Sequence, residues 1–308
     1  MSDRRRITTD DIEHLVTHGY VVIENFLTPA ELKSGRACLS QYFPSPDRYF
    51  ATPERYARLP SYIEFPFSGD ALNYISTHPE LIAFMEDLLG TRELRLAESR
   101  LQAKYASSDP PGGPDEVMHC DAWGPNQLVY PRDDGLFRQV PMILYYSDVT
   151  EEHGPTYIVS QQVTKGMALL SESPSEGPAV PYVTHSREAA PQLYEDAHPV
   201  LAPAGSLLVM SARTFHRGSA MSGSRAARFV HFITYRANAA TWMSTQGWPP
   251  ASPRANTRQL QSFIVNASPR QREMLGFPPA GHPYWDDETI AGVAARYPDI
   301  DMSPYRPA

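Results

Sequence analysis

The chain has 308 residues, of which 42% are hydrophobic and 20% charged, as expected for a folded globular protein rather than a disordered one. Its formal net charge of −8 argues against a nucleic-acid or anionic-membrane partner, because either would need clustered Lys and Arg. With only two cysteines, Cys38 and Cys120, the chain cannot build a disulfide framework or a cysteine-based zinc site, and a reducing cytoplasm is expected. We expect neither a secretory signal nor a membrane-spanning helix, since no run approaches about 18 apolar residues.

The first 93 residues are predicted to be mainly helical. Residues 10–18 have a helical pattern that ends at Gly19, and a short β-rich run follows at 20–23. Thr28 precedes Pro29 and Glu31, which is the signature of a capped helix start, and a similar signature occurs at 77–80.

From about residue 94 the pattern changes to short β-branched or alternating runs bounded by Gly, Pro and Asp, which predict strands. The predicted strands are 96–105, 117–121, 140–147, 156–159, 198–202, 206–210 and 228–235. Their spacing leaves no room for a helix between each pair, which favours an antiparallel sandwich or barrel. We expect one domain over 1–308, with a helical part at 1–93, a β core at 94–237 and an irregular, helical part at 238–308.

The first chemical signal is an H-x-D triplet in the strand predicted over 117–121. Residues two apart in a strand project to the same face, so His119 and Asp121 can present an imidazole and a carboxylate to one point, with Cys120 facing away. The triplet alone is weak evidence, because its spacing is common. A third ligand is expected from His216, which follows a strand-like run. Two imidazoles and one carboxylate on one face of iron(II) leave three open positions, two for a 2-oxo acid and one for O₂.

With these residues in place, the chain resembles the phytanoyl-CoA dioxygenase family of iron(II)- and 2-oxoglutarate-dependent oxygenases. The matching segments follow the expected order over more than 200 residues: 18–27, His119-Cys120-Asp121, 153–160, Phe215-His216-Arg217-Gly218-Ser219-Ala220 and Arg228. The resemblance implies a mainly β fold with flanking helices, whose core is a double-stranded β-helix of the jelly-roll, cupin-like type. It also implies Fe(II), 2-oxoglutarate and O₂ as cofactor and cosubstrates.

The resemblance further assigns candidate cosubstrate contacts. Arg228 lies about a dozen residues after His216 and matches the arginine that binds the distal carboxylate of 2-oxoglutarate; Arg225 is its competitor. Ser219 matches a small hydroxyl residue that shares that carboxylate, and Thr156 matches a hydroxyl residue that contacts the cosubstrate.

Taken together, these features predict an iron(II)- and 2-oxoglutarate-dependent dioxygenase that hydroxylates a small molecule and releases succinate and CO₂. Halogenation is disfavoured, since the related halogenases lack the carboxylate that Asp121 provides. One alternative is the same cofactor chemistry used for desaturation, cyclisation, epoxidation or epimerisation of a natural product. Another is a non-catalytic, cupin-like protein that binds a metal or a ligand. No basic cluster suggests a CoA phosphate site, so we expect a free small molecule, of secondary metabolism.

Other side chains are open to a structural or a functional interpretation. The odd offset of His231 from Arg228 should point it to the opposite face of the strand, which favours a structural role. Trp123 and Tyr130 could line a substrate pocket or belong to the core. The period alone does not decide whether Gln102 and Lys104 face inward.

Overall fold

The computed structural model describes residues 6–106, 115–122, 137–167, 183–239, 257–297 and 299–306. The helices are α1 Thr9–His18, α2 Pro29–Leu39, α3 Pro46–Ala51, α4 Asp70–Ser76, α5 Pro79–Leu89, α6 Gln161–Thr164, α7 Pro191–Glu195, α8 Thr257–Asn266, α9 Pro269–Met274 and α10 Asp287–Arg296, with short 3₁₀ turns at Pro53–Tyr56, Glu151–His153 and Ser303–Tyr305. The strands are β1 Tyr20–Ile23, β2 Ile63–Glu64, β3 Leu94–Tyr105, β4 Met118–Cys120, β5 Gln139–Tyr145, β6 Tyr157–Ile158, β7 Val183–His185, β8 His198–Pro199, β9 Leu207–Met210, β10 His216–Arg217 and β11 Ala227–Ala237.

Local sequence explains where the N-terminal helices begin and end. The Thr28 side chain accepts a hydrogen bond from the backbone N–H of Glu31, and the Glu31 carboxylate accepts one from the backbone N–H of Thr28, so this capping box starts α2 as predicted. Thr8 and Asp11 form the same arrangement at α1, which ends at Gly19 with a φ of 79°. That left-handed conformation costs glycine little, and it turns the chain directly into β1.

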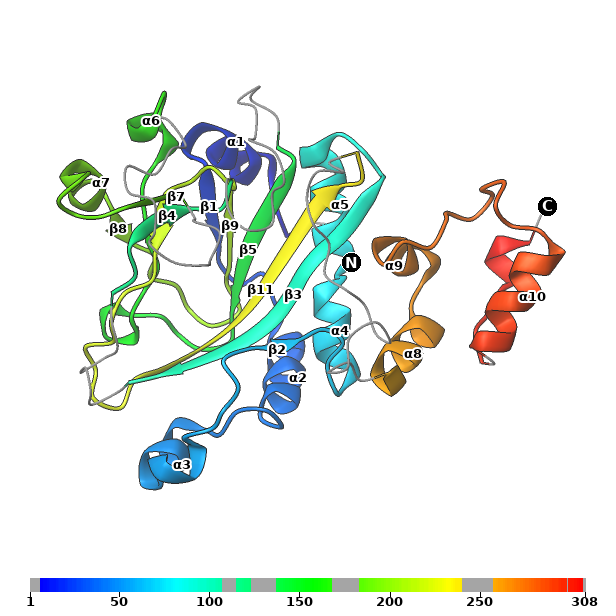
Figure 1. The fold of residues 1–308 in the computed structure, drawn as a ribbon, viewed down its shortest axis with the longest axis horizontal. Helices are drawn as coiled ribbons and strands as arrows, with labels where there is room; N and C mark the ends of the chain where they lie inside the picture. Colours follow the sequence, from blue (N-terminus) through cyan, green and yellow to red (C-terminus); the bar gives the residue numbers. More distant parts are fainter. Residues whose placement is uncertain are drawn as a thin grey trace.

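The strands form two antiparallel sheets, which Figure 1 shows facing one another. The major sheet has the order β1-β9-β5-β11-β3-β2, and the minor sheet has the order β7-β4-β10-β6-β8. β1 and β2 precede residue 94 but pair with β9 and β3, so the β core reaches beyond the range of 94–237 expected for it. The short strands β7 and β10 lie outside the predicted strands and complete the minor sheet around β4.

Helices cover the outer face of the major sheet, where α5 packs on β11 and α9 on β3 (Figure 1). The largest hydrophobic cluster fills this layer and includes the fully buried side chains of Leu81, Met85, Ile233 and Tyr235. His231 also lies in this layer, where its Nε2 is 2.8 Å from the Ser99 hydroxyl and burial lowers its pKa to about 3. The histidine therefore points away from the space between the sheets, as its offset from Arg228 predicted.

The space between the sheets has an apolar part and a polar part. Ile143, Tyr145, Ile158, Leu208 and Val230 belong to a buried cluster drawn from both sheets. The rest of the space is a cavity of about 540 Å³, lined by side chains from β3, β4, β5, β10 and β11. Among the described residues, a polar chamber thus lies beside an apolar cluster between the two sheets.

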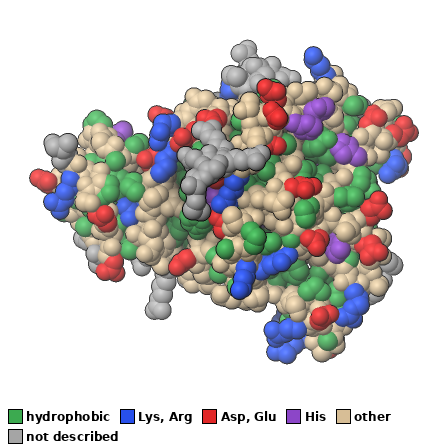
Figure 2. Space-filling model, turned by 180° about the vertical axis from the view of Figure 1, so that it is seen from behind, with side chains coloured by type: hydrophobic (Ala, Val, Ile, Leu, Met, Phe, Trp, Pro, Cys, Tyr) green, Lys and Arg blue, Asp and Glu red, His purple; other side chains and the backbone are tan. Residues whose placement is uncertain are grey.

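Among the described residues, no helix is long and apolar enough to span a bilayer. Figure 2 shows acidic and basic side chains interspersed over the face that it draws.

Candidate metal centre

The three residues predicted as metal ligands meet at one wall of the cavity. β4 and β10 pair antiparallel with His119 directly opposite His216, and their ring centroids lie 4.4 Å apart. Asp121 follows β4 on the same side, with its Oδ2 4.0 Å from His216 Nε2. One ligand atom from each of the three residues lies within 4.8 Å of the others. These side chains could hold one metal ion.

Strand alternation places these side chains. In β4, Met118 and Cys120 are fully buried and pack with Phe215 in a small cluster on the outer face of the minor sheet. His119 therefore projects to the inner face, and Asp121, two residues further, does the same. Cys120 faces away from the metal centre, as expected.

Each histidine is oriented by a backbone carbonyl. His119 Nδ1 lies 2.9 Å from the carbonyl oxygen of Val117, and His216 Nδ1 lies 3.0 Å from that of Thr214. Because a carbonyl only accepts, both Nδ1 atoms carry the proton, which makes Nε2 the donor atom for a metal. Burial lowers the pKa of His216 and the neighbouring His119 lowers it further, although Asp121 acts in the opposite direction. His216 is therefore biased toward the neutral form that binds metals.

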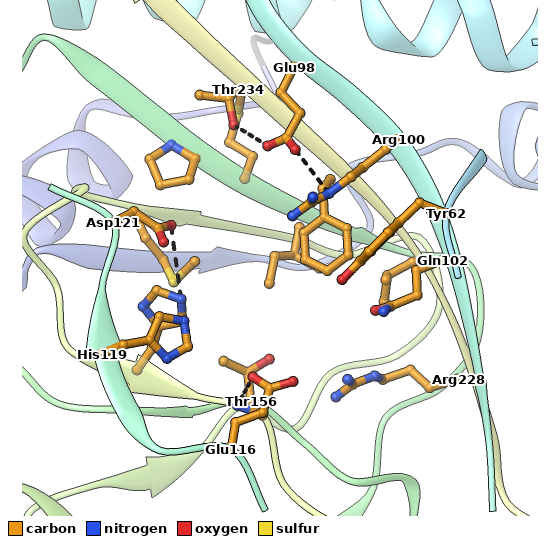
Figure 3. A pocket seen from close by; sticks show the side chains of 18 of the residues that line it. Tyr62, Glu98, Arg100, Gln102, Glu116, His119, Asp121, Thr156, Arg228 and Thr234 are labelled. Carbon is orange, nitrogen blue, oxygen red and sulfur yellow. Dashed lines mark hydrogen bonds and ion pairs between the residues drawn. The ribbon is translucent and has the colours of Figure 1, made fainter. Parts of the chain in front are cut away.

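The predicted carboxylate-binding arginine reaches the same cavity from the opposite sheet. Arg228 belongs to β11, is only 6% exposed and lines the cavity together with the buried Thr156 (Figure 3). Its Nη1 donates to the carbonyl of Gly154, while its Nε has no partner among the described residues. Burial lowers the pKa of Arg228, which means that the site holds a cation short of compensating partners.

A buried phenol that the sequence did not indicate lies close to this arginine. Tyr145 is fully buried, and its hydroxyl lies beside the side chain of Thr156 without a well-aligned hydrogen bond among the described residues. Burial raises the pKa of the phenol, and the positive charge of Arg228 offsets part of the rise. The guanidinium of Arg228, whose Nε is unpaired among the described residues, lines the cavity with Thr156, and the phenol of Tyr145 lies behind them; this arrangement suits a ligand carboxylate. Sequence could have indicated Tyr145 only through its place at the end of an apolar strand, which is typical of core residues.

The remaining residues considered as site residues from the sequence do not all reach the cavity. Ser219 is buried, but its hydroxyl donates to the carbonyl of Pro155 at 2.7 Å, and it is not among the residues that line the cavity. Arg225 is 61% exposed and pairs with Asp47 on the surface. Gln102 lines the cavity, whereas the ammonium of Lys104 donates to the carbonyl of Ser219 at 2.8 Å. Trp123 and Tyr130 lie outside the described residues.

Comparison with known proteins decides the family. The family model described as phytanoyl-CoA dioxygenase (PhyH) matches residues 15–229. The chain belongs to the phytanoyl-CoA dioxygenase family. It is therefore a non-haem iron enzyme that depends on 2-oxoglutarate, and the His119–Asp121–His216 donor set fits that metal. This family membership overturns the non-catalytic alternative.

Solved structures share the fold at low sequence identity. HygX from Streptomyces hygroscopicus, crystallised with nickel, 2-oxoglutarate and hygromycin B, is 16% identical with a TM-score of 0.52, and the match covers 75% of this chain and 88% of HygX. The 2-oxoglutarate-dependent carbocyclase SnoK from nogalamycin biosynthesis is 17% identical with a TM-score of 0.52, covering 74% of this chain and 83% of SnoK. No curated protein matches the sequence. The jelly-roll fold with flanking helices is confirmed.

Proposed function

We propose that this enzyme hydroxylates a small-molecule substrate, with iron held by His119, Asp121 and His216 and the distal carboxylate of 2-oxoglutarate held by Arg228. One observation carries the proposal: the three ligands and the buried guanidinium face one cavity from opposite sheets. A metal-binding barrel needs the triad, but it does not need a buried cation across from it. A dicarboxylate that binds metal at one end needs both.

Each residue of the site has a definite task in this proposal. The carbonyls of Val117 and Thr214 hold the imidazoles so that both Nε2 atoms point to the metal. Arg228 and Thr156 orient the cosubstrate from the floor of the cavity, while Ser219 stays a predicted contact whose hydroxyl is engaged by Pro155. Iron(II) with 2-oxoglutarate and O₂ supplies the oxidising power to replace a C–H bond by C–OH, with succinate and CO₂ as co-products.

The size of the cavity supports a small-molecule substrate. A volume of about 540 Å³ lies within the usual range for small-ligand sites and has to hold the cosubstrate as well. HygX, which shares the fold, binds hygromycin B in its crystal structure, and we infer a free small molecule for this chain too. The surface of mixed charge in Figure 2 gives no reason to expect a nucleic-acid substrate.

The test is substrate-dependent succinate formation. Iron(II)-loaded enzyme with 2-oxoglutarate and O₂ is screened against a broad panel of small molecules, with Asp121→Ala as the matched inactive variant. We expect succinate above the uncoupled level only with the right compound, and a product that has gained one oxygen atom. Desaturation, cyclisation, epoxidation or epimerisation would use the same ligands, so a product without the added hydroxyl would replace hydroxylation by one of them. Succinate that never depends on an added compound would refute the proposal.

A further inference from the structure

The wall across from the metal ligands carries an ion pair that the cofactor chemistry does not use. Glu98 and Arg100 project from β3 into the cavity, with Arg100 Nε 2.9 Å from Glu98 Oε1, and about a third of each side chain is exposed (Figure 3). Thr234 adds a hydrogen bond of 3.4 Å to the other carboxylate oxygen. The pair lies away from Arg228 and leaves the floor of the cavity to the cosubstrate.

The guanidinium of Arg100 is held in a fixed orientation. Its central carbon lies 4.3 Å from the ring centroid of Tyr62, just before β2, and 5.1 Å from that of Phe232 on β11, so two aromatic rings pack near it. Its Nη groups point toward the middle of the cavity, and the described residues offer them no acceptor (Figure 3). A rigid donor edge facing an open chamber is built to receive an oxygen atom of a ligand.

The carboxylate of Glu98 has few donors among the described residues. Burial raises the pKa of Glu98, Arg100 offsets part of the rise, and Asp121 across the cavity adds to it. The only described hydroxyl that donates to the carboxylate, that of Thr234, does so at the long distance of 3.4 Å. A ligand that donated a hydrogen bond to Glu98 would relieve this deficit.

The charges of the cavity indicate what kind of ligand this is. Near the floor, Arg228 and Lys104 face the carboxylates of Glu116 and Asp115, and Asp115 is paired with Arg217 at 3.1 Å, which leaves positive charge for a dicarboxylate. At the opposite wall, Glu98 and Arg100 cancel one another. A ligand with a net charge would therefore enter this part of the cavity without a compensating partner, at a desolvation cost that an uncharged ligand avoids.

We propose that Glu98 and Arg100 are the specificity residues of the substrate site, and that they bind an uncharged ring carrying hydroxyl groups, such as a sugar or a cyclitol. A hydroxyl both donates and accepts, so one or two neighbouring hydroxyls satisfy the Glu98 carboxylate and the Arg100 Nη groups together. Tyr62 and Val117, which are 42% and 46% exposed, line the same cavity and give the apolar face of such a ring a surface to pack against. This inference rests on the proposed function, which places the bound ring next to the metal.

Ligand-observed saturation-transfer NMR tests the inference on the full chain, with and without iron(II) and 2-oxoglutarate under anaerobic conditions. The probes are methyl glycosides and cyclitols, set against amino acids and aromatic carboxylates of similar size. We expect neutral polyols to bind and Glu98→Leu and Arg100→Met each to raise their dissociation constant about tenfold or more, since each variant removes a hydrogen bond to a charged group. Glu98→Gln, which keeps an acceptor oxygen, should retain part of the affinity and guards against misfolding of the leucine variant. Glu13→Gln on the exposed face of α1 is the control.

Either of two binding patterns would overturn the inference: charged probes that bind more tightly than every neutral polyol, or polyol binding that neither the Glu98 nor the Arg100 variants weaken. The absence of any bound polyol counts in the same way. Failure of the proposed function has a different signature, because 2-oxoglutarate binding depends on Arg228 and the metal ligands. If 2-oxoglutarate fails to bind while polyols bind in a Glu98-dependent way, the proposed function falls and the polyol site stands.

Discussion

Replacing Arg228 by Met should abolish tight binding of 2-oxoglutarate while leaving the metal site and the fold intact. The guanidinium is 6% exposed and donates from Nη1 to Gly154, so Nε and Nη2 remain for a ligand carboxylate. Two hydrogen bonds between charged groups contribute about 1.5–3 kcal/mol each. Lys104 lies opposite Arg228 in the β3–β11 register and keeps positive charge nearby, so we expect a net loss of about 3 kcal/mol, or about a hundredfold in affinity.

The assay is an anaerobic titration of the iron(II)-loaded protein with 2-oxoglutarate, followed by the weak visible charge-transfer band of the bidentate complex. Arg225→Met is the matched control, because it removes the same charge from a surface pair three residues away. Thermal unfolding of Arg228→Met should change little, since loss of the donor to Gly154 is offset by relief of a buried charge. Unchanged 2-oxoglutarate affinity in Arg228→Met, or an equal loss in Arg225→Met, would refute the assignment.

Three further predictions follow from the structure. Asp121→Ala should lower iron(II) affinity at least about a hundredfold, measured by competition with a chromogenic chelator, because it removes the carboxylate of the triad; unchanged affinity would exclude Asp121 as a ligand. Tyr145→Phe should leave the melting temperature nearly unchanged, since relief of the buried hydroxyl offsets the loss of its interaction with Thr156, yet weaken 2-oxoglutarate about tenfold; a lower melting temperature with normal 2-oxoglutarate affinity would contradict this. Burial acts to raise the pKa of Glu31, but hydrogen bonds from Arg6, Thr28 and His78 outweigh it and lower the pKa to about 2. Its contribution to stability is therefore complete above the unfolded pKa of about 4.5 and is lost as the pH falls toward 2. Glu31→Gln should cost about 1–2 kcal/mol at pH 7, allowing for solvent screening, with the gap to the parent protein closing over that range in urea titrations; a gap that does not depend on pH would contradict the pKa.

The grouping of His119 with Asp121 was predictable because it depends on short-range geometry. His119 and Asp121 share a strand face whatever the rest of the fold does, and the family resemblance supplied the distant His216 and Arg228. The structure brings all four to one cavity. The helix starts were predictable for the same reason, since a capping box such as that of Thr28 is a contact between residues three apart.

The role proposed for Glu98 and Arg100 could not be predicted from the sequence, although the alternation of polar residues along their strand was visible in it. Along β3, Glu98, Arg100, Gln102 and Lys104 alternate with smaller or apolar residues, which marks one polar face. Both faces of β3 are covered, one by helices and one by the minor sheet, so alternation alone does not say which face lines a cavity. The same limit applies to Ser219, whose hydroxyl is directed by a tertiary contact with Pro155 that no local pattern encodes.

The position of these groups on two sheets links ligand binding to the stability of the sandwich. The predicted metal ligands lie on or beside strands of the minor sheet, whereas Arg228, whose Nε has no partner among the described residues, belongs to the major sheet. A buried polar group such as Arg228 Nε, which has no partner among the described residues, costs stability in the ligand-free protein. A dicarboxylate bound between the predicted metal ligands and Arg228, as proposed above, would remove that cost and stabilise the folded protein against unfolding. The buried polar groups that would bind 2-oxoglutarate would therefore also make the stability of the folded protein depend on whether 2-oxoglutarate is bound.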